Sequence, residues 1–351
     1  MPSFDETPFL VLWELTRACN LACQHCRAEA CTERDEGELS LEEGFEALRQ
    51  IKDMGTQLVV LTGGDPLKNP HAFAYIEEGA RLGLRMTMTP SATPLLTRES
   101  VARMARAGLQ RMAVSLDGPD AVSHDRFRGV LGSFNCTWNA ISAAHENNLP
   151  VQINSSICRS NVHQFDQMAE CVAASGATLW SVFFVVPVGR AGFDDELSAE
   201  EFEEVFAKMA KLAGSAAFDI KSTAAPHFRR HLLQQKAKSD KRIVGLPGGM
   251  WRAARGVNDA SGLFFLSHTG DVYPSGFLPI SAGNIRHQPL AEIYRESELF
   301  RTLRDTDLLE GKCGRCEFKK VCGGSRARAY AFTGNYMAEE PCCSYQPREQ
   351  A

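Results

Sequence analysis

The sequence predicts an α/β protein: a parallel β-sheet surrounded by helices, followed by a small cysteine-rich region near the C-terminus. Between residues 9 and 186, short apolar runs alternate with stretches of helical periodicity, as in repeated βαβ units. From residue 262 onward the chain changes to short strands, turns and closely spaced cysteines. The first pattern predicts a sheet that closes partly or fully into a barrel, with its reactive loops at the carboxyl ends of the strands.

The elements of this sheet are expected to alternate regularly. Six apolar runs are predicted as strands, at residues 9–15, 57–62, 84–88, 111–116, 151–157 and 179–186. The helices between them are predicted at residues 40–54, 69–82, 98–107, 135–147 and 162–175. The first helix has a clear start, because Ser40 and Glu43 form a capping-box pattern, and a clear stop at Gly55. Crossovers of this kind are right-handed in nearly all proteins.

Two further regions follow the sheet. A capping-box pattern at Ser198 and Glu201 begins an amphipathic helix, and a strongly basic helix is predicted at residues 226–238. Short strands at residues 263–266 and 272–273 and a small helix at residues 290–304 come next. The predicted domains are a barrel at residues 1–190, a helical connection with a solvated face at 191–255, and a small α+β domain at 256–351.

Composition restricts the class of protein. The formal net charge is −5 and the isoelectric point is about 6.0, so neither nucleic acid nor a membrane is expected as a partner. No apolar run approaches the ~18 residues of a membrane-spanning helix. Residues 1–8 lack a basic region, so we expect no signal peptide and a cytoplasmic protein. In that compartment the 12 cysteines favour metal binding over disulfides.

The first cysteine group directly follows the first apolar run. Cys19, Cys23 and Cys26 have the spacing C-x3-C-x2-C within one short loop. Thiolates bind zinc or iron–sulfur clusters, and a full set of protein ligands for either is usually four. Three ligands leave one metal position open for chemistry. The simpler alternatives are a zinc knuckle with its fourth ligand elsewhere, or three buried thiols.

The second cysteine group lies near the C-terminus. Cys313, Cys316 and Cys322 are followed by the adjacent Cys342 and Cys343. Four thiolates make a closed site, either structural zinc or an iron–sulfur cluster, and spacing alone does not separate the two. We assign Cys342 as the fourth ligand, although spacing does not decide between it and Cys343. One open and one closed sulfur site in the same chain indicate redox chemistry.

Polar and small residues follow or end most of the predicted strands. Because the carboxyl ends of parallel strands share one edge, we expect these residues to ring one rim of the sheet. They are Gly63, Gly64, Asp65, Ser91, Thr93, Ser115, Asp117 and Asn154. Ordinary turn chemistry explains several of them equally well.

On these motifs the sequence resembles the radical S-adenosylmethionine (SAM) superfamily. The first cysteine loop, with His25 before its last cysteine, looks like the SAM-cluster signature, and Gly63-Gly64-Asp65 resembles the Gly-Gly-Glu motif with Asp for Glu. The cysteines from Cys313 onward resemble a SPASM-type auxiliary-cluster domain. The resemblance covers nearly the whole chain. Stretches such as "WELTRACNLACQHCRAEA" and "GKCGRCEFKKVCGGSRARAY" look closest to heme-biosynthesis enzymes that act on iron-porphyrin side chains.

This resemblance implies a partial (β/α)6 TIM-like barrel with a small C-terminal α+β cluster-binding domain. Cys19, Cys23 and Cys26 would hold a 4Fe-4S cluster whose fourth iron binds SAM, and reductive cleavage would yield a 5′-deoxyadenosyl radical that abstracts hydrogen from substrate. The other implied SAM contacts are the Gly63–Asp65 turn at the ammonium, Ser91 and Thr93 at the methionyl part, Ser115 and Asp117 at the ribose, Asn154 at the ribose or the carboxylate, and Arg128 or Arg126 at the carboxylate.

The C-terminal region departs from the pattern expected of relatives with two auxiliary clusters. Further cysteines are expected near Val257, at Ser275 and at Ser325, and none is present. These losses together would remove one auxiliary cluster and leave the other. We therefore predict two 4Fe-4S clusters, one of them auxiliary with four cysteine ligands.

The substrate stays open between two classes. A tetrapyrrole is the first expectation, with hydrogen abstraction from a propionate side chain, and radical modification of a ribosomally made peptide is the alternative. The basic residues Arg315, Lys319, Lys320, Arg326 and Arg328 could bind carboxylates or simply face solvent. A low-potential electron donor of the flavodoxin or ferredoxin type is implied as a partner. The non-enzymatic alternative is a zinc or iron–sulfur protein.

Overall fold

The computed structural model describes residues 3–238 and 256–348. Its framework is one ten-stranded sheet in the order β10-β9-β8-β1-β2-β3-β4-β5-β6-β7. All neighbouring pairs from β8 through β1 to β7 are parallel. The pairs β8–β9 and β9–β10 are antiparallel. The strands are Leu10–Glu14 (β1), Leu58–Thr62 (β2), Arg85–Met88 (β3), Arg111–Ser115 (β4), Val151–Ile157 (β5), Leu179–Phe184 (β6), Asp219–Thr223 (β7), Leu263–Leu266 (β8), Asp271–Tyr273 (β9) and Gly283–Asn284 (β10).

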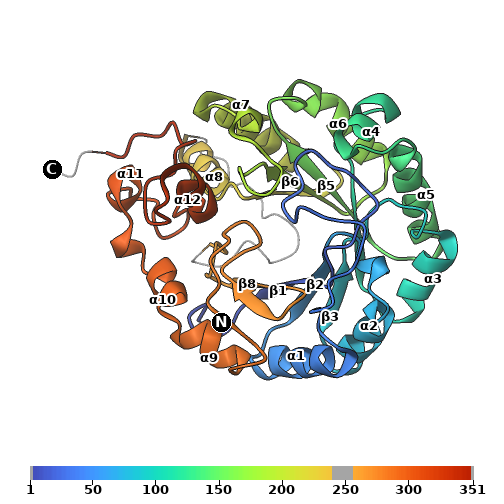
Figure 1. Cartoon of the computed structure of the whole chain (residues 1–351). Coiled ribbons are helices and arrows are strands. Elements are labelled where there is room, and N and C mark those ends of the chain that lie inside the picture. The colour runs from blue at the N-terminus through green and yellow to red at the C-terminus, as the bar shows by residue number, and fades with distance from the viewer. Residues whose placement is uncertain (1–2, 239–255, 349–351) are drawn as a thin grey trace.

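The helices surround this sheet. Figure 1, which looks down the partial barrel, shows α1 to α7 outside the curved sheet and α8 to α12 completing the ring. The helices are Leu41–Asp53 (α1), Ala72–Arg81 (α2), Arg98–Arg106 (α3), Ala121–Arg128 (α4), Ser133–Glu146 (α5), Phe165–Ala174 (α6), Ala199–Ala213 (α7), His227–Lys238 (α8), Leu290–Glu296 (α9), Glu298–Arg304 (α10), Gly311–Gly314 (α11) and Arg326–Thr333 (α12). The α/β fold and its parallel sheet are as predicted.

The barrel has more strands than the sequence predicts. β7 lies within the stretch expected to be a helical connection, and the rest of that stretch, from residue 239 to 255, lies outside the described residues. The sequence does not predict β7 as a strand because this segment is mostly polar, with Ile220 as its one fully buried side chain. β8, expected in a separate small domain, instead pairs in parallel with β1 and so belongs to the same sheet.

Three helices of the described structure were also not predicted: α4, α11 and α12. α4 follows the loop after β4 and is short, with little apolar periodicity. Its ends are nevertheless well marked, because the Asp120 side chain accepts a hydrogen bond from the Ser123 amide at 2.8 Å and Gly129 ends the helix with a φ of 71°. The capping boxes predicted for α1 and α7 are both present.

The core lies between the outer face of the sheet and the helices. Trp13 of β1 packs on Tyr75 of α2 with ring centroids 4.8 Å apart. Trp180 of β6 packs on Phe165 of α6 at 4.9 Å, and its indole N–H donates to Ser155 Oγ at 2.9 Å. Because side chains alternate along a strand, the residues between these anchors face the inside of the barrel. The inner face is therefore free to carry polar groups.

A fully buried arginine joins the C-terminal region to the barrel. Arg328 of α12 donates to the Glu196 carboxylate at 2.7 Å. It also donates to the carbonyl oxygens of Val185, which follows β6, at 3.0 Å and of Ala224, which follows β7, at 2.9 Å. Glu340 lies on its other side at 3.5 Å. This network holds the second cysteine region against one edge of the barrel.

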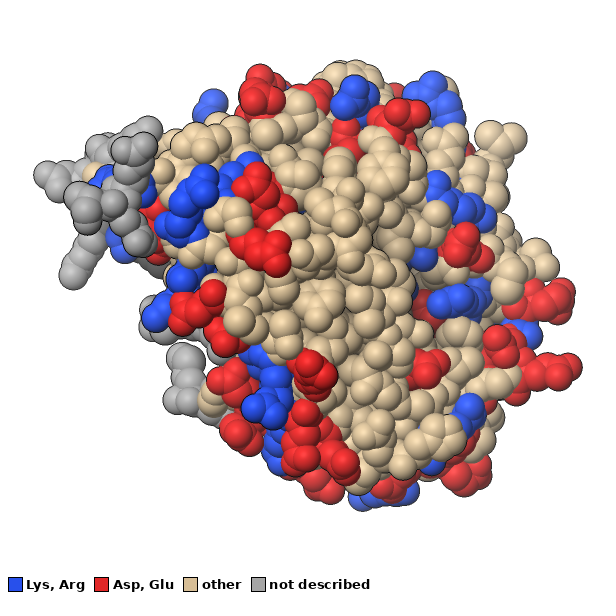
Figure 2. All heavy atoms as spheres, turned by 60° about the vertical axis from the view of Figure 1, so that its left-hand side comes forward, with Lys and Arg blue, Asp and Glu red and all other residues tan. Residues whose placement is uncertain are grey.

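The surface carries charges of both signs. In Figure 2, Lys and Arg are interspersed with Asp and Glu on the face that is turned forward, and uncharged residues fill much of its middle. This face has no continuous basic area. In the described part of the chain, no helix is long and apolar enough to span a bilayer.

The first prediction concerns this buried arginine. Arg328→Met should destabilise the protein by about 3–5 kcal/mol, because it leaves the Glu196 and Glu340 carboxylates buried without their partner. Arg301→Met, at an exposed position of α10, is the matched control and should leave stability unchanged. Thermal unfolding of the two variants measures the difference. Equal melting temperatures would contradict the structural role given to Arg328.

Candidate active site

The first cysteine loop follows β1 and is tied down by backbone hydrogen bonds. The Cys19 amide donates to the Cys31 carbonyl at 2.7 Å, and the Cys31 amide donates to Arg17 at 3.2 Å. Cys19 and Cys23 are buried, and Cys26 is half-buried. The three predicted thiols therefore lie on one closed loop at the carboxyl end of β1.

Each of the three sulfurs has a hydrogen-bond donor aimed at it. The Leu21 amide donates to Cys19 Sγ at 3.3 Å and the Ala30 amide to Cys26 Sγ at 3.4 Å. A guanidinium nitrogen of Arg128 lies 3.6 Å from Cys23 Sγ. Burial raises the pKa of the Cys19 thiol, so a thiolate there needs such donors or a bound cation. The donor set fits three thiolates that hold a metal cluster.

The Gly63-Gly64 turn packs directly on this loop. A Cβ on Gly63 would lie 2.5 Å from the Thr16 carbonyl oxygen, and one on Gly64 would lie 2.5 Å from that of Arg17. The Gly64 amide donates to the Thr16 carbonyl at 2.7 Å. The two glycines are therefore needed for close backbone packing against the cysteine loop. The Gly64 carbonyl, one of those expected near the SAM ammonium, accepts a hydrogen bond from Ser91 Oγ at 2.7 Å.

Asp65 joins this turn to the loop after β3. Its buried carboxylate accepts hydrogen bonds from Thr93 Oγ1 at 2.7 Å and from the Ser91 amide at 3.4 Å. Burial raises the pKa of Asp65 above its ordinary value despite these donors. Ser91 also lies 3.5 Å from Cys19 Sγ. Asp65 and Thr93 thus bind each other, and Ser91 is the member of this group next to the cysteine loop.

An ion pair stabilises the other side of the loop. Arg128 of α4 donates from Nε to Asp117 at 2.6 Å, and the second Asp117 oxygen accepts from the Ser156 amide at 2.6 Å. Burial alone would raise the pKa of Asp117, but the charge of Arg128 holds it below its ordinary value. The Ala22 amide donates to the Arg128 carbonyl at 3.1 Å. Both residues, predicted to contact SAM, have internal partners in the structure.

Ser115 and Asn154 remain on the inner face of the barrel. They are partners in the register of β4 and β5, and both are half-buried. Asn154 accepts a hydrogen bond from Gln152 at 2.7 Å, which leaves its amide N–H groups available. Of the residues predicted to bind ribose, Ser115 and Asn154 are therefore the two that face the inside of the barrel.

A buried carboxylate that was not among the predicted site residues lies at the base of the loop. Glu14 is fully buried and pairs with Arg27 at 2.9 Å and with His268 at 2.9 Å. Although burial raises the pKa of Glu14, Arg27 and then His268 lower it to about 2. Arg27 directly follows Cys26, so this pair fixes the end of the loop. A glutamate inside an otherwise apolar strand was the signal that could have identified it.

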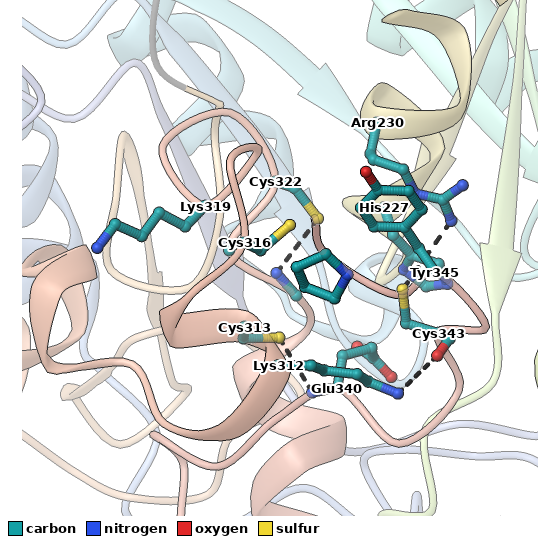
Figure 3. A pocket seen from close by; sticks show the side chains of 13 residues that line it. His227, Arg230, Lys312, Cys313, Cys316, Lys319, Cys322, Glu340, Cys343 and Tyr345 are labelled. Atoms are coloured by element: carbon teal, nitrogen blue, oxygen red, sulfur yellow. Dashed lines mark hydrogen bonds between the residues drawn. The ribbon is translucent and has the colours of Figure 1, made fainter. Parts of the chain in front are cut away.

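The second cysteine group lines a pocket between α8 and the C-terminal loops. Figure 3 shows Cys313, Cys316, Cys322 and Cys343 around a common space, which is partly open to solvent. Backbone amides donate to two of the sulfurs: Gly324 to Cys322 at 3.4 Å and Glu340 to Cys313 at 3.3 Å. Four thiols that line a pocket with donors behind them fit a cluster site.

The two adjacent cysteines lie in different surroundings. Cys343 lines the pocket, whereas Cys342 is buried with its thiol 3.7 Å from the Glu196 carboxylate. Neighbouring side chains of a non-helical segment point in different directions, so only one of the two can face the pocket. The cysteine that lines the pocket is Cys343, whereas Cys342, the ligand expected from the sequence, is buried beside Glu196.

Helix α8 contributes a buried face to this site. The sequence indicates a basic helix with a solvated face, but His227 and Arg230 line the pocket and are buried. Arg230 Nη2 lies 3.9 Å from Cys343 Sγ. Exposed residues such as Lys236 form the solvated face that the sequence predicts, and the basic composition of the helix gives no sign of the buried face.

Comparison with known proteins decides the family. The model of the radical SAM superfamily matches residues 13–172, and the SPASM iron–sulfur cluster-binding model matches residues 259–317. An AdoMet-dependent heme synthase of Nitratidesulfovibrio vulgaris is 43% identical over 342 residues, which cover 97% of this chain and 93% of the relative. The chain belongs to the radical SAM superfamily. An AdoMet-dependent heme synthase of Methanosarcina barkeri is 39% identical over 347 residues, 99% of each chain.

Solved structures agree on the fold of this radical SAM protein. Streptococcus suis SuiB bound to the precursor peptide SuiA superposes with a TM-score of 0.75, at 16% identity, over 97% of this chain and 76% of SuiB. The chain is thus a radical SAM enzyme that is similar in sequence to AdoMet-dependent heme synthases and has the fold of a partial barrel. The radical SAM domain implies SAM and a 4Fe-4S cluster, and the SPASM domain implies a further iron–sulfur cluster.

The second prediction separates the adjacent cysteines. Cys343→Ser should remove the auxiliary cluster and lower the iron content from about eight to about four per chain, because one of four ligands to a 4Fe-4S cluster is lost. Cys342→Ser is the matched control and should keep both clusters. Iron and sulfide analysis of anaerobically purified protein measures this. Loss of iron in the Cys342 variant alone would restore the original assignment.

Proposed function

We propose that this chain cleaves SAM reductively at the first cysteine loop and uses the resulting radical to remove a hydrogen atom from a tetrapyrrole side chain. The observation that carries the proposal is the loop itself, with three sulfurs and a donor on each. A cluster held by Cys19, Cys23 and Cys26 would supply the electron and the open iron for SAM. The chain's other residues bind and orient around that centre.

The proposed roles of these residues follow their contacts. Ser115 and Asn154 bind the ribose, because they are polar, half-buried and on the inner face of the barrel. Asp117 and Arg128 position the loop at Cys23, and Asp65 with Thr93 positions the Gly63-Gly64 turn. Ser91 lies beside Cys19 and can reach the methionyl part of SAM.

Two 4Fe-4S clusters are part of the proposal. Cys19, Cys23 and Cys26 hold the first, and Cys313, Cys316, Cys322 and Cys343 hold the auxiliary cluster. Ser325, where the family resemblance leads one to expect a further cysteine, instead caps α12 by accepting from the Arg328 amide at 3.2 Å. The electron reaches the first cluster from a low-potential donor of the flavodoxin or ferredoxin type.

A lysine inside the barrel supports an anionic substrate. Ile220 of β7 is in register with the outward-packing Trp180, so the adjacent Lys221 lies on the inner face, in register with Ser181. Burial and then the nearby Arg111 lower the pKa of Lys221 to about 8. Lys221 makes no hydrogen bond or ion pair with any residue in the described ranges 3–238 and 256–348. A carboxylate of a tetrapyrrole propionate is the partner that this cation lacks.

The basic residues near the second cysteine group support this substrate less than expected. Arg326 and Arg328 are buried and donate to backbone carbonyls of the chain. Lys319 pairs with Asp307 at 2.7 Å. Arg315 and Lys320 are exposed. The inner face of the barrel is therefore the better position for substrate carboxylates.

The third prediction tests the radical chemistry. Reduced, anaerobic protein should convert SAM slowly to 5′-deoxyadenosine, and addition of Fe-coproporphyrin should accelerate this and change the absorbance of the porphyrin. Cys23→Ala should abolish the conversion, because the first cluster loses a ligand. Cys136→Ala, outside both cysteine groups, is the matched control. Continued turnover in the Cys23 variant would contradict the open-cluster assignment, and acceleration by a precursor peptide alone would favour the peptide alternative.

The fourth prediction tests the inner lysine. Lys221→Met should raise KM for the tetrapyrrole by about tenfold or more, because a charged hydrogen bond to its carboxylate is lost. SAM cleavage without substrate should be unchanged. Lys236→Met, on an exposed position of α8, is the matched control. A Lys221 variant with unchanged KM would remove this residue from the substrate site.

A further inference from the structure

Helix α8 forms one wall of the second cysteine pocket. His227 is its first residue and Arg230 lies one turn further along, on the same side of the helix. Both line the pocket together with the four thiols, as Figure 3 shows. Neither residue is a thiolate ligand, so their presence in this wall needs another explanation.

The imidazole of His227 is buried without a partner. Its exposed fraction is 1%, and neither ring nitrogen has a hydrogen-bond partner in the described structure. Phe202 and Phe206 hold the ring, with centroids 4.9 and 4.8 Å away. A neutral imidazole carries one N–H donor in either tautomer. A buried donor left unsatisfied costs about 1–3 kcal/mol, so a group bound in the pocket is the natural acceptor.

Arg230 is held beside the same pocket by other contacts. Its side chain is 4% exposed, and it is anchored by Glu203 of α7 and by Gln234 at 2.9 Å. The guanidinium also lies 5.3 Å from the centre of the Tyr345 ring. Its Nη2 still reaches Cys343 Sγ at 3.9 Å. A fixed positive charge thus faces a thiol that we assign as a cluster ligand.

We propose that α8 tunes the auxiliary cluster: the His227 N–H and the Arg230 guanidinium donate to its sulfur atoms and raise its reduction potential. This inference rests on the proposed function, since it requires a cluster in this pocket. Four thiolates leave such a cluster negatively charged, and reduction adds one more negative charge. Donors to sulfur and nearby cations therefore stabilise the reduced form more than the oxidised form.

The experiment is an EPR-monitored redox titration of the full-length holoprotein. His227→Phe keeps a ring between Phe202 and Phe206 but lacks the N–H. At a fixed potential it should lower the ratio of reduced to oxidised auxiliary cluster by about tenfold, a shift of 59 mV to more negative potential for one electron. The potential of the first cluster should not move and is the internal control. His227→Asn, which retains an N–H donor, should shift less, and Arg230→Gln should shift in the same direction as His227→Phe.

The result that overturns the proposal is an unmoved auxiliary potential in His227→Phe with both clusters intact, because the ring then only packs. A second measurement does not depend on that variant. In a Cys23→Ala chain, which should keep only the auxiliary cluster, protein labelled with 15N-histidine should show a 15N coupling in pulsed EPR, and its absence also overturns the proposal. Failure of the proposed function differs from both outcomes, since the wild-type protein would then hold about four irons instead of about eight.

Discussion

Buried sulfur needs hydrogen-bond donors, and this requirement organises both cysteine groups. A thiolate in a dry site is unstable unless N–H groups or cations face it. In the first loop the donors are two backbone amides and Arg128. In the second pocket they are two backbone amides, Arg230 and Arg326, whose Nη2 lies 3.9 Å from Cys313 Sγ. The three arginines belong to α4, α8 and α12, which lie in the ring of helices. The cluster sites are therefore built by the fold around the loops as much as by the loops.

Buried ion pairs hold these elements in position. Asp117 with Arg128 fixes one side of the first loop, Glu14 with Arg27 fixes its end, and Glu196 with Arg328 fixes the C-terminal region. A buried pair adds little net stability, but removal of one partner is costly because the other charge stays desolvated. Such pairs therefore restrict the loops to one arrangement, which a site that must hold a metal cluster and a cofactor requires.

The C-terminal region completes the barrel instead of standing beside it. β8 of this region pairs with β1, the first strand of the barrel. Arg328 of the same region donates to the residues that follow β6 and β7, the last two strands. The C-terminal region therefore contacts the barrel at both its first and its last strands. The second pocket is thereby set against the barrel wall through α8. A change in α8 would be felt at the auxiliary site without any contact to the first loop.

The sequence by itself determined the α/β alternation, the two cysteine groups and the family, because periodicity and thiol spacing are local properties. It predicted the capped helices α1 and α7 for the same reason. Tertiary structure alone decided the rest. The polar strand β7 is recognisable only beside β6, and Cys343 is distinguished from its neighbour only by which side chain faces the pocket. Likewise, Asp117 accepts from Ser156, Arg128 reaches Cys23, and the His227 ring packs on Phe202 of another helix, so these contacts are visible only in the folded barrel.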